Sequence, residues 1–146
     1  MSANPSPNPA TSSRGANVQL PTDQELVLKV IPMPGDCNAN GDIFGGWVMA
    51  QVDLAGAVVP ARYVKGRMAT VAVNEFVFKQ PVRVGDILSF FAKLTRIGRT
   101  SITVKIEVFA ERFGSTNEYA KVTEASLTYV AIDENGKPRE VPQKLI

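Results

Sequence analysis

Asp42 is the residue whose place in the sequence most strongly suggests chemistry. It follows a short run of turn-forming residues, 38–41, and it precedes a long apolar segment, 44–61, in which Gln51 and Asp53 are the only strongly polar side chains. A helix that is apolar on every side must be buried or lie in a membrane. Asp42 is therefore predicted to lie where a polar loop enters a buried helix, a position in which a carboxylate can take part in a reaction.

Two glycines, Gly45 and Gly46, follow Asp42 at the predicted start of this helix. A helix N-terminus carries backbone N–H groups without intrahelical partners and the positive end of the helix dipole. A glycine also lets a ligand approach the backbone closely. The pair is thus a candidate oxyanion hole. The same residues fit a purely structural interpretation, in which Asn40 or Asp42 caps the helix and the glycines allow tight packing.

The composition excludes several kinds of active site. The 146 residues include no histidine and a single cysteine, Cys37. Ser-His-Asp and Cys-His catalysis, a disulfide scaffold and most zinc or iron sites are therefore excluded, and we expect no metal. The net charge of +2 gives no indication that the protein binds nucleic acid. Because Gln51 and Asp53 interrupt the apolar segment, no membrane span is expected either.

The remaining sequence predicts the elements that must hold Asp42 in place. Residues 1–20 are rich in proline and small polar residues, lack the features of a signal peptide, and are predicted to form a disordered tail of a cytoplasmic protein. Pro60 and the later Gly66 mark the predicted end of the helix. Apolar patterns predict five strands, at residues 25–31, 69–78, 87–97, 100–112 and 119–132.

The order of these elements predicts the fold. Short turns join the last four strands, which implies antiparallel pairing. In the strand at 100–112, one face carries Ile102, Val104, Ile106 and Val108, and the opposite face carries Thr103, Lys105, Glu107 and Phe109. A helix that is apolar all round needs a sheet curled about it. We therefore expect an α+β fold, with a five-stranded antiparallel sheet wrapped around one long central helix.

The loop and helix motif at 38–47, Asn-Ala-Asn-Gly-Asp-Ile-Phe-Gly-Gly-Trp, closely resembles that of the hotdog-fold acyl-CoA thioesterases, and especially the YciA-like hydrolases of bacteria. Further stretches that carry the resemblance are Met-Ala-Gln-Val-Asp at 49–53, Phe-Lys-Gln-Pro-Val-Arg-Val-Gly-Asp at 78–86 and Gly-Arg-Thr-Ser-Ile at 98–102. The resemblance implies a single hotdog domain over residues 21–146.

The resemblance also implies an activity and an assembly. The activity is hydrolysis of an acyl-CoA thioester to a free acid and coenzyme A, with no cofactor, because coenzyme A is part of the substrate and a product. The assembly is a homodimer whose sheets join edge to edge, often built into a hexamer as a trimer of dimers. The active sites lie at the dimer interface, and an exposed edge strand favours such pairing on physical grounds too.

In thioester hydrolysis Asp42 is the candidate general base or nucleophile, and the residues leave these two roles open. The thioester carbonyl would lie at Gly45 and Gly46. Asn40 is a candidate for orienting water or substrate, although an Asn before Gly is more often a turn residue. Candidate contacts to the phosphates of coenzyme A flank the turn at Gly98, and these are Arg96, Arg99, Thr100 and Ser101. Weaker candidates of the same kind are Lys79, Lys137 and Arg139.

The remaining polar residues have structural interpretations, and the fold has functions other than hydrolysis. Asp53 is predicted to be a buried structural acid, Gln51 a structural or interface residue, and Cys37 incidental. A hotdog dehydratase is disfavoured because that chemistry typically uses a histidine. The alternative function is a non-catalytic acyl-CoA sensor of the same fold. The sequence Asn-Glu-Phe at 74–76 departs from the pattern expected for the closest relatives, which puts the partner-side substrate contacts in doubt.

Overall fold

The computed structural model describes residues 18–112, 114–115 and 117–142. Most of the predicted disordered tail, residues 1–17, lies outside the described residues, so this part of the tail stays a prediction. The described chain starts in contact with the sheet, because the N–H group of Val18 donates to the carbonyl oxygen of Tyr119 at 3.1 Å.

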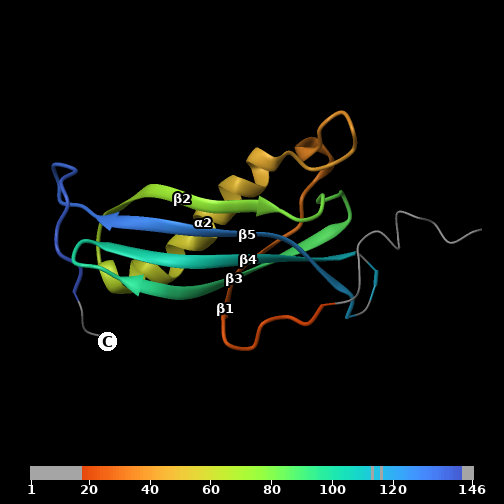
Figure 1. Cartoon of the computed structure of the whole chain (residues 1–146). Helices are drawn as coiled ribbons and strands as arrows, with labels where there is room; N and C mark the ends of the chain where they lie inside the picture. The colour runs from red at the N-terminus through yellow and green to blue at the C-terminus, as the bar shows by residue number, and fades with distance from the viewer. Residues whose placement is uncertain (1–17, 113, 116, 143–146) are drawn as a thin grey trace, which may run out of the picture.

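The fold is one antiparallel sheet with one long helix, as the sequence predicts (Figure 1). The sheet order is β1-β3-β4-β5-β2, so β1 and β2 form its two edges. Each predicted strand is present, with its ends within one residue of the prediction. The elements are β1 (Glu25–Val30), the 3-10 helix η1 (Pro34–Asp36), α2 (Gly45–Val64), β2 (Met68–Phe78), β3 (Asp86–Ile97), β4 (Ser101–Arg112) and β5 (Tyr119–Ala131).

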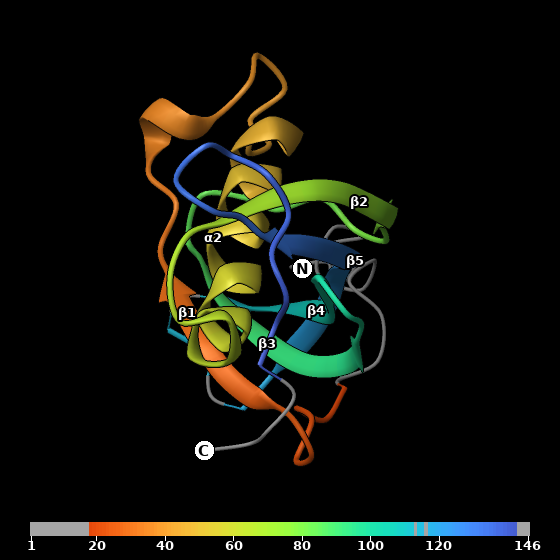
Figure 2. The ribbon, with the colours of Figure 1, turned by 90° about the vertical axis from the view of Figure 1, so that its left-hand side faces the viewer.

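The core lies between α2 and the inner face of the sheet. The helix packs against all five strands, and Figure 2 shows it running along this face of the curled sheet. The predicted alternation in β4 is confirmed, because one set of its side chains is fully buried in the core: Ile102, Val104, Ile106 and Val108. Burial of each such side chain stabilises the fold by about 1.5–3 kcal/mol, which is why the period-two pattern determines the face of the sheet.

The outer face of the sheet is more covered than its polar pattern suggests. Glu107 of β4 is only 8% exposed. Gln24 donates to its carboxylate at 2.7 Å, and Lys121 of β5 lies 2.7 Å from its other oxygen. The segment that precedes β1 thus crosses onto the outer face and is held there by polar contacts.

The helix ends between Pro60 and Gly66, the two residues that mark its predicted end. Pro60 lies within α2, which ends only after Val64, so the prediction that Pro60 helps to end the helix is wrong. The chain leaves the helix at Lys65, whose left-handed backbone has φ 51° and ψ 63°. The Arg139 guanidinium donates to the Val64 carbonyl oxygen at 3.0 Å, which satisfies one of the last helical acceptors.

One face of α2 is not buried by its own chain. Leu54 is 63% exposed and Met49 is 44% exposed, although the sequence predicts a helix buried on every side. The neighbouring edge strand β2 also exposes large apolar side chains: Val71, Val73, Val77 and Phe78. The all-apolar helix therefore requires a second apolar surface beyond that of the sheet.

Candidate active site

Asn38 organises the loop that carries Asp42. Its side-chain oxygen accepts hydrogen bonds from the N–H groups of Asn40 at 2.9 Å and Asp42 at 3.2 Å. Its own N–H group donates to the Asp42 carbonyl oxygen at 2.7 Å. Gly41 has φ +83°, a conformation that favours glycine. The loop is therefore a tight hydrogen-bonded turn that presents the Asp42 side chain in a defined direction.

A second segment, which connects β2 to β3, pairs with this loop. Asp42 forms an isolated antiparallel bridge with Arg83, and the Ile43 N–H group donates to the Val82 carbonyl oxygen at 2.8 Å. The Arg83 Nε atom lies 3.9 Å from Oδ1 of Asp42. Residues about forty positions apart in the sequence thus meet by backbone pairing next to the carboxylate.

The N-terminus of α2 has no side-chain cap. The N-cap residue is Phe44, which cannot cap through its side chain, so the expectation that Asn40 or Asp42 caps the helix is wrong. The N–H groups of Trp47 and Val48 both donate to the Phe44 carbonyl oxygen. Within the described chain, the N–H groups of Gly45 and Gly46 have no acceptor. They are free donors at the positive end of a 20-residue helix.

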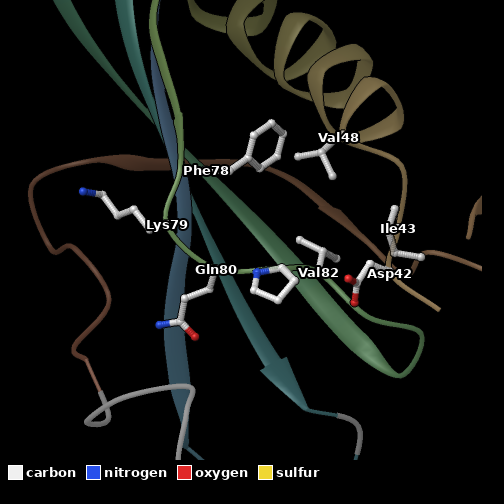
Figure 3. Close-up of a pocket in the computed structure, with 9 residues that line it drawn as sticks. Asp42, Ile43, Val48, Phe78, Lys79, Gln80 and Val82 are labelled. Carbon is white, nitrogen blue, oxygen red and sulfur yellow. The ribbon is translucent and has the colours of Figure 1, made fainter. Parts of the chain in front are cut away.

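A cavity of about 350 Å³ brings Asp42 together with this helix N-terminus (Figure 3). In Figure 3 Asp42 and Ile43 lie on one side of it, and Lys79 and Gln80 on the other. Its lining residues are Asp42, Ile43, Gly45, Val48, Phe78, Lys79, Gln80, Pro81 and Val82. The site therefore combines a carboxylate, free backbone donors and an apolar wall of Phe78 and Val48. This arrangement suits attack on a carbonyl group.

Three of the candidate site residues differ in how close they come to this cavity. Lys79 lines it, but its side chain points away from Asp42 and its Nζ atom lies 3.5 Å from Glu124. Gly46 does not line the cavity, although its free N–H group lies on the same first turn as Gly45. Asn40 is exposed and outside the lining, in the turn held by Asn38.

The candidate phosphate-binding turn lies at the far end of the molecule. Gly98 follows β3, whose other end is next to Arg83 and Asp42, and 12 residues of strand span roughly 36 Å at about 3.3 Å per residue. Arg96 and Arg99 are exposed there, and Ser101 accepts the Gly98 N–H group at 2.7 Å. Within one protomer, Arg96, Arg99, Thr100 and Ser101 are therefore not brought to Asp42.

The C-terminal segment stabilises this distant turn. The N–H groups of Ala131 and Val141 donate to the carbonyl oxygens of Thr100 at 2.9 Å and Arg99 at 2.8 Å. The Arg99 side chain is 77% exposed and lies 3.7 Å from Glu140. Lys137 begins the same segment, and Arg139 is occupied at the C-terminus of α2. The backbone of the turn is thus fixed, while the Arg99 side chain is exposed to solvent beside Glu140.

The two polar side chains of the helix interior are half-buried. Asp53 accepts hydrogen bonds from Thr70 Oγ1 at 2.8 Å and from the Tyr129 hydroxyl at 3.1 Å. The hydroxyl is also 2.7 Å from the Asp53 carbonyl oxygen. Asp53 therefore joins α2 to β5 and β2 through neutral donors. The Cys37 thiol lies 3.7 Å from the Gly41 carbonyl oxygen, a neutral acceptor that does not activate it.

Sequence reasoning missed two residues beside Asp42. Asn38 could have been found from its position three residues before Gly41, since Asn in such turns often bonds to the backbone two residues on. Arg83 carried no local signal, because its contact with Asp42 depends on the pairing of two distant loops.

The described residues contain no group of three or more acidic or cysteine side chains placed to hold a metal ion. None of the helices in the described chain is long and apolar enough to cross a membrane.

Comparison with known proteins agrees with this geometry. Residues 40–114 match the family model of the thioesterase superfamily. An acyl-CoA thioester hydrolase, YciA, of Salmonella typhimurium is 46% identical over 120 residues, which is 81% of this chain and 90% of that protein. The crystal structure of a hexameric thioesterase from Yersinia pestis is 45% identical, with a TM-score of 0.78, over 86% of this chain and 100% of the other.

A hexameric hotdog-fold thioesterase of Campylobacter jejuni has a TM-score of 0.79 and 39% identity, over 84% of this chain and 94% of that one. The family match over residues 40–114 includes Asp42, α2 and the strands β2, β3 and β4. This chain therefore belongs to the thioesterase superfamily, and within it to the YciA-like acyl-CoA thioester hydrolases of the hotdog fold.

Proposed function

We propose that this protein hydrolyses acyl-CoA thioesters to a carboxylic acid and coenzyme A. The observation that carries the proposal is the cavity in which the Asp42 carboxylate faces a helix N-terminus with free N–H groups. A carboxylate supplies the attacking group or activates water, and the donors hold the oxyanion that forms. One such donor is commonly worth about 2.7–4 kcal/mol in the transition state.

Two routes use the same residues. In the first route, Asp42 takes a proton from a water molecule while the water oxygen attacks the carbonyl carbon. Collapse of the tetrahedral intermediate then releases the coenzyme A thiolate. In the other, a carboxylate oxygen of Asp42 attacks directly, the thiolate leaves, and water hydrolyses the mixed anhydride. In both routes the negative charge passes to the carbonyl oxygen beside Gly45 and Gly46. Neither route needs a metal or a cofactor.

The assembly we propose is a homodimer that pairs β2 with β2 of a second copy. The free edge of β2 and the exposed face of α2 together present Met49, Leu54, Val73 and Phe78. An apolar edge of this kind favours pairing with another chain. The similar proteins of Yersinia pestis and Campylobacter jejuni are hexamers, which supports a trimer of such dimers.

This pairing also resolves the separation between the carboxylate and the basic turn. An antiparallel pair places the Phe78 end of one β2 beside the Met68 end of the other. Asp42 and Gly45 lie at the Phe78 end, whereas the Gly98 turn lies at the Met68 end. We therefore propose that each site takes Asp42 from one protomer and the phosphate contacts of Arg96, Arg99, Thr100 and Ser101 from the other.

Two further parts of the proposal concern the rest of the chain. We place residues 21–146 in one domain, since a single cluster of buried residues joins α2, β3, β4, β5 and Val141 near the C-terminus, and partly buried side chains of β1 and β2 pack against it. A reducing cytoplasmic location is supported by the lone unpaired Cys37.

The direct test is to incubate the protein with acyl-CoAs of increasing chain length and to measure released thiol. The wild type is expected to release coenzyme A, whereas Asp42→Asn should lose turnover by ~10³-fold or more and keep its melting temperature, because the amide preserves the shape of the side chain. Binding of acyl-CoA without release of thiol by the wild type would identify a sensor. Undiminished hydrolysis by Asp42→Asn would contradict the role of Asp42.

Subunit complementation tests the composite site. When Asp42→Asn and Arg99→Glu protomers are mixed and allowed to exchange, half of the dimers are mixed. In each mixed dimer one site carries both changes and the other carries neither. Activity at low substrate concentration should therefore recover to about one quarter of the wild-type value. If both residues served the same protomer, no intact site would form and activity would not recover.

A further inference from the structure

Arg83 is the cation closest to the candidate catalytic carboxylate. Its Nε atom lies 3.9 Å from Oδ1 of Asp42, and this is the one ion pair that Asp42 forms within the described chain. Both side chains are partly covered, with 28% of Arg83 and 37% of Asp42 exposed.

The Arg83 backbone is held rigidly on both sides. Its N–H group donates to Oδ2 of Asp86 at 2.9 Å, and its carbonyl oxygen accepts the Asp86 N–H group at 3.1 Å. Asp86 is fully buried at the start of β3. The bridge between Asp42 and Arg83 then ties this turn to the catalytic loop. The start of β3 therefore fixes the Arg83 backbone beside the loop that carries Asp42, so the guanidinium starts from a defined point near the carboxylate.

The length of the ion pair matters for what it can do. At 3.9 Å it lies well beyond the 2.7–2.9 Å of a charge-assisted hydrogen bond. Arg83 thus attracts the carboxylate without occupying either of its oxygens as a hydrogen-bond acceptor. Both carboxylate oxygens of Asp42 therefore stay available to accept a hydrogen bond from water or to attack a thioester carbon. The electrostatic attraction to Arg83 still limits rotation of the Asp42 side chain.

We propose that Arg83 is a positioning residue for the hydrolysis, which acts through Asp42 by holding its carboxylate toward the helix N-terminus. This inference rests on the proposed function, because it assigns a task to Arg83 only if Asp42 is the reacting group. Loss of the guanidinium leaves Asp42 free to rotate, and a misplacement of about 1 Å can cost roughly 10²-fold in rate.

The experiment compares Arg83→Gln and Arg83→Lys with the wild type and with Lys29→Gln. Lys29 is the matched control, because it also forms a half-exposed ion pair, with Glu111 at 3.2 Å, but on β1. Arg83→Gln should lower kcat about 10-fold or more and change KM less than about twofold. Arg83→Lys should recover part of kcat, and Lys29→Gln should match the wild type.

Two further measurements separate positioning from other roles. The Kd for coenzyme A, measured by calorimetry, should be the same in Arg83→Gln as in the wild type. In the Asp42→Asn background, Arg83→Gln should cause no further loss of the residual rate, since its effect passes through Asp42. A weaker Kd or a raised KM at unchanged kcat would make Arg83 a phosphate contact and would overturn the proposal.

An equal loss of rate with and without Asp42, or a loss that follows a lowered melting temperature, would also overturn it, because either result assigns Arg83 to the fold. If the wild type is active and the Arg83→Gln variant is equally active, the positioning role of Arg83 is overturned and the proposed function stands. A wild type that hydrolyses no acyl-CoA overturns the proposed function, and this inference with it.

Discussion

The two glycines at the start of α2 have different surroundings. Substitution by alanine should therefore have different effects at the two positions. A β-carbon at Gly45 would lie 3.4 Å from the Phe78 ring, at the wall of the cavity. A β-carbon at Gly46 would meet nothing within 4 Å. A methyl group at position 45 would therefore contact Phe78 and take up space at the cavity wall, whereas one at position 46 would stand in open space.

Gly45→Ala is expected to lower kcat/KM about 10-fold, because the added methyl group fills the space between Phe78 and the free N–H groups. Its matched control is Gly46→Ala, in which the same methyl group points into open space. That change should raise stability by about 0.5–1 kcal/mol, since alanine favours the helix. Steady-state kinetics and thermal melts of both variants check this, and equal kinetic effects would contradict the assigned difference.

At the scale of elements, a buried hydroxyl joins α2 to the sheet. Tyr129 of β5 is 2% exposed, and burial raises its pKa far above the ordinary value, so the hydroxyl keeps its proton as a donor to Asp53. Thr70 of β2 donates to the same carboxylate. A β-carbon at Gly56 would collide with the Tyr129 hydroxyl, so the helix reaches this depth only with glycine there. The sequence-based prediction of Asp53 as a structural acid agrees with these contacts.

Tyr129→Phe should destabilise the protein by about 1–3 kcal/mol, because it removes a donor from a half-buried carboxylate and carbonyl. Gly56→Ala should cost about 1–3 kcal/mol through overpacking. In the double variant the hydroxyl that causes the collision is absent. The double variant should therefore lose less free energy of unfolding than the two single variants combined. Urea unfolding of the four proteins measures this coupling, and strict additivity would contradict direct packing of the two positions.

Ion pairs on the outer face of β4 and β5 make the stability of the fold depend on pH. Burial raises the pKa of Glu107, but hydrogen bonds from Gln24 and Lys121 and the charges of Lys121 and Lys105 outweigh it and lower the pKa below its ordinary 4.5. A lowered pKa in the folded state gives stability that is present above the unfolded value. This stability is lost as the pH falls through the folded value.

Glu107→Gln should therefore be less stable than the wild type at neutral pH, and the difference should shrink as the pH falls below about 4.5. Glu124 shares Lys121 and also has a lowered pKa, so acid should still destabilise the variant, though less steeply. Melting temperatures from about pH 7 to about pH 3 check the prediction. A difference that grows on acidification would have the wrong sign.

At the scale of the whole molecule, the main feature is the exposed apolar face of α2 and β2. It lies next to the cavity, because Phe78 belongs to both. If a second copy covers this face, assembly and catalysis depend on the same residues. Dissociation would then separate Asp42 from the basic turn of the other protomer.

Val73→Lys, in the middle of β2, should shift the protein toward monomer and lower kcat/KM in proportion, because a lysine on an edge strand opposes pairing. Leu26→Lys on β1, at the opposite edge, is the control and should leave the β2-paired dimer intact. Light scattering after gel filtration, with activity measured at the same concentrations, tests both. A monomeric Val73→Lys with full activity would contradict the composite site.

The sequence by itself determined the elements and the main chemical group. Period-two alternation in the last two strands, and apolar runs bounded by prolines and turn residues in the other three, placed each strand end within one residue. Both signals are local properties of the chain. The lack of histidine and the apolar segment after Asp42 singled out that carboxylate. Gly66 correctly marked the end of the helix, but Pro60 lies inside it, since the sheet holds the helix in place over its whole length.

Only the tertiary structure decided which distant residues meet. It paired the Asp42 loop with Arg83, left Gly45 and Gly46 without a cap, and separated the Gly98 turn from the cavity by the length of β3. No local pattern encodes these relations, because they arise from backbone pairing between segments and from the direction in which the strands run. For the same reason a helix that is apolar on every side predicted complete burial, whereas one chain alone covers only part of it.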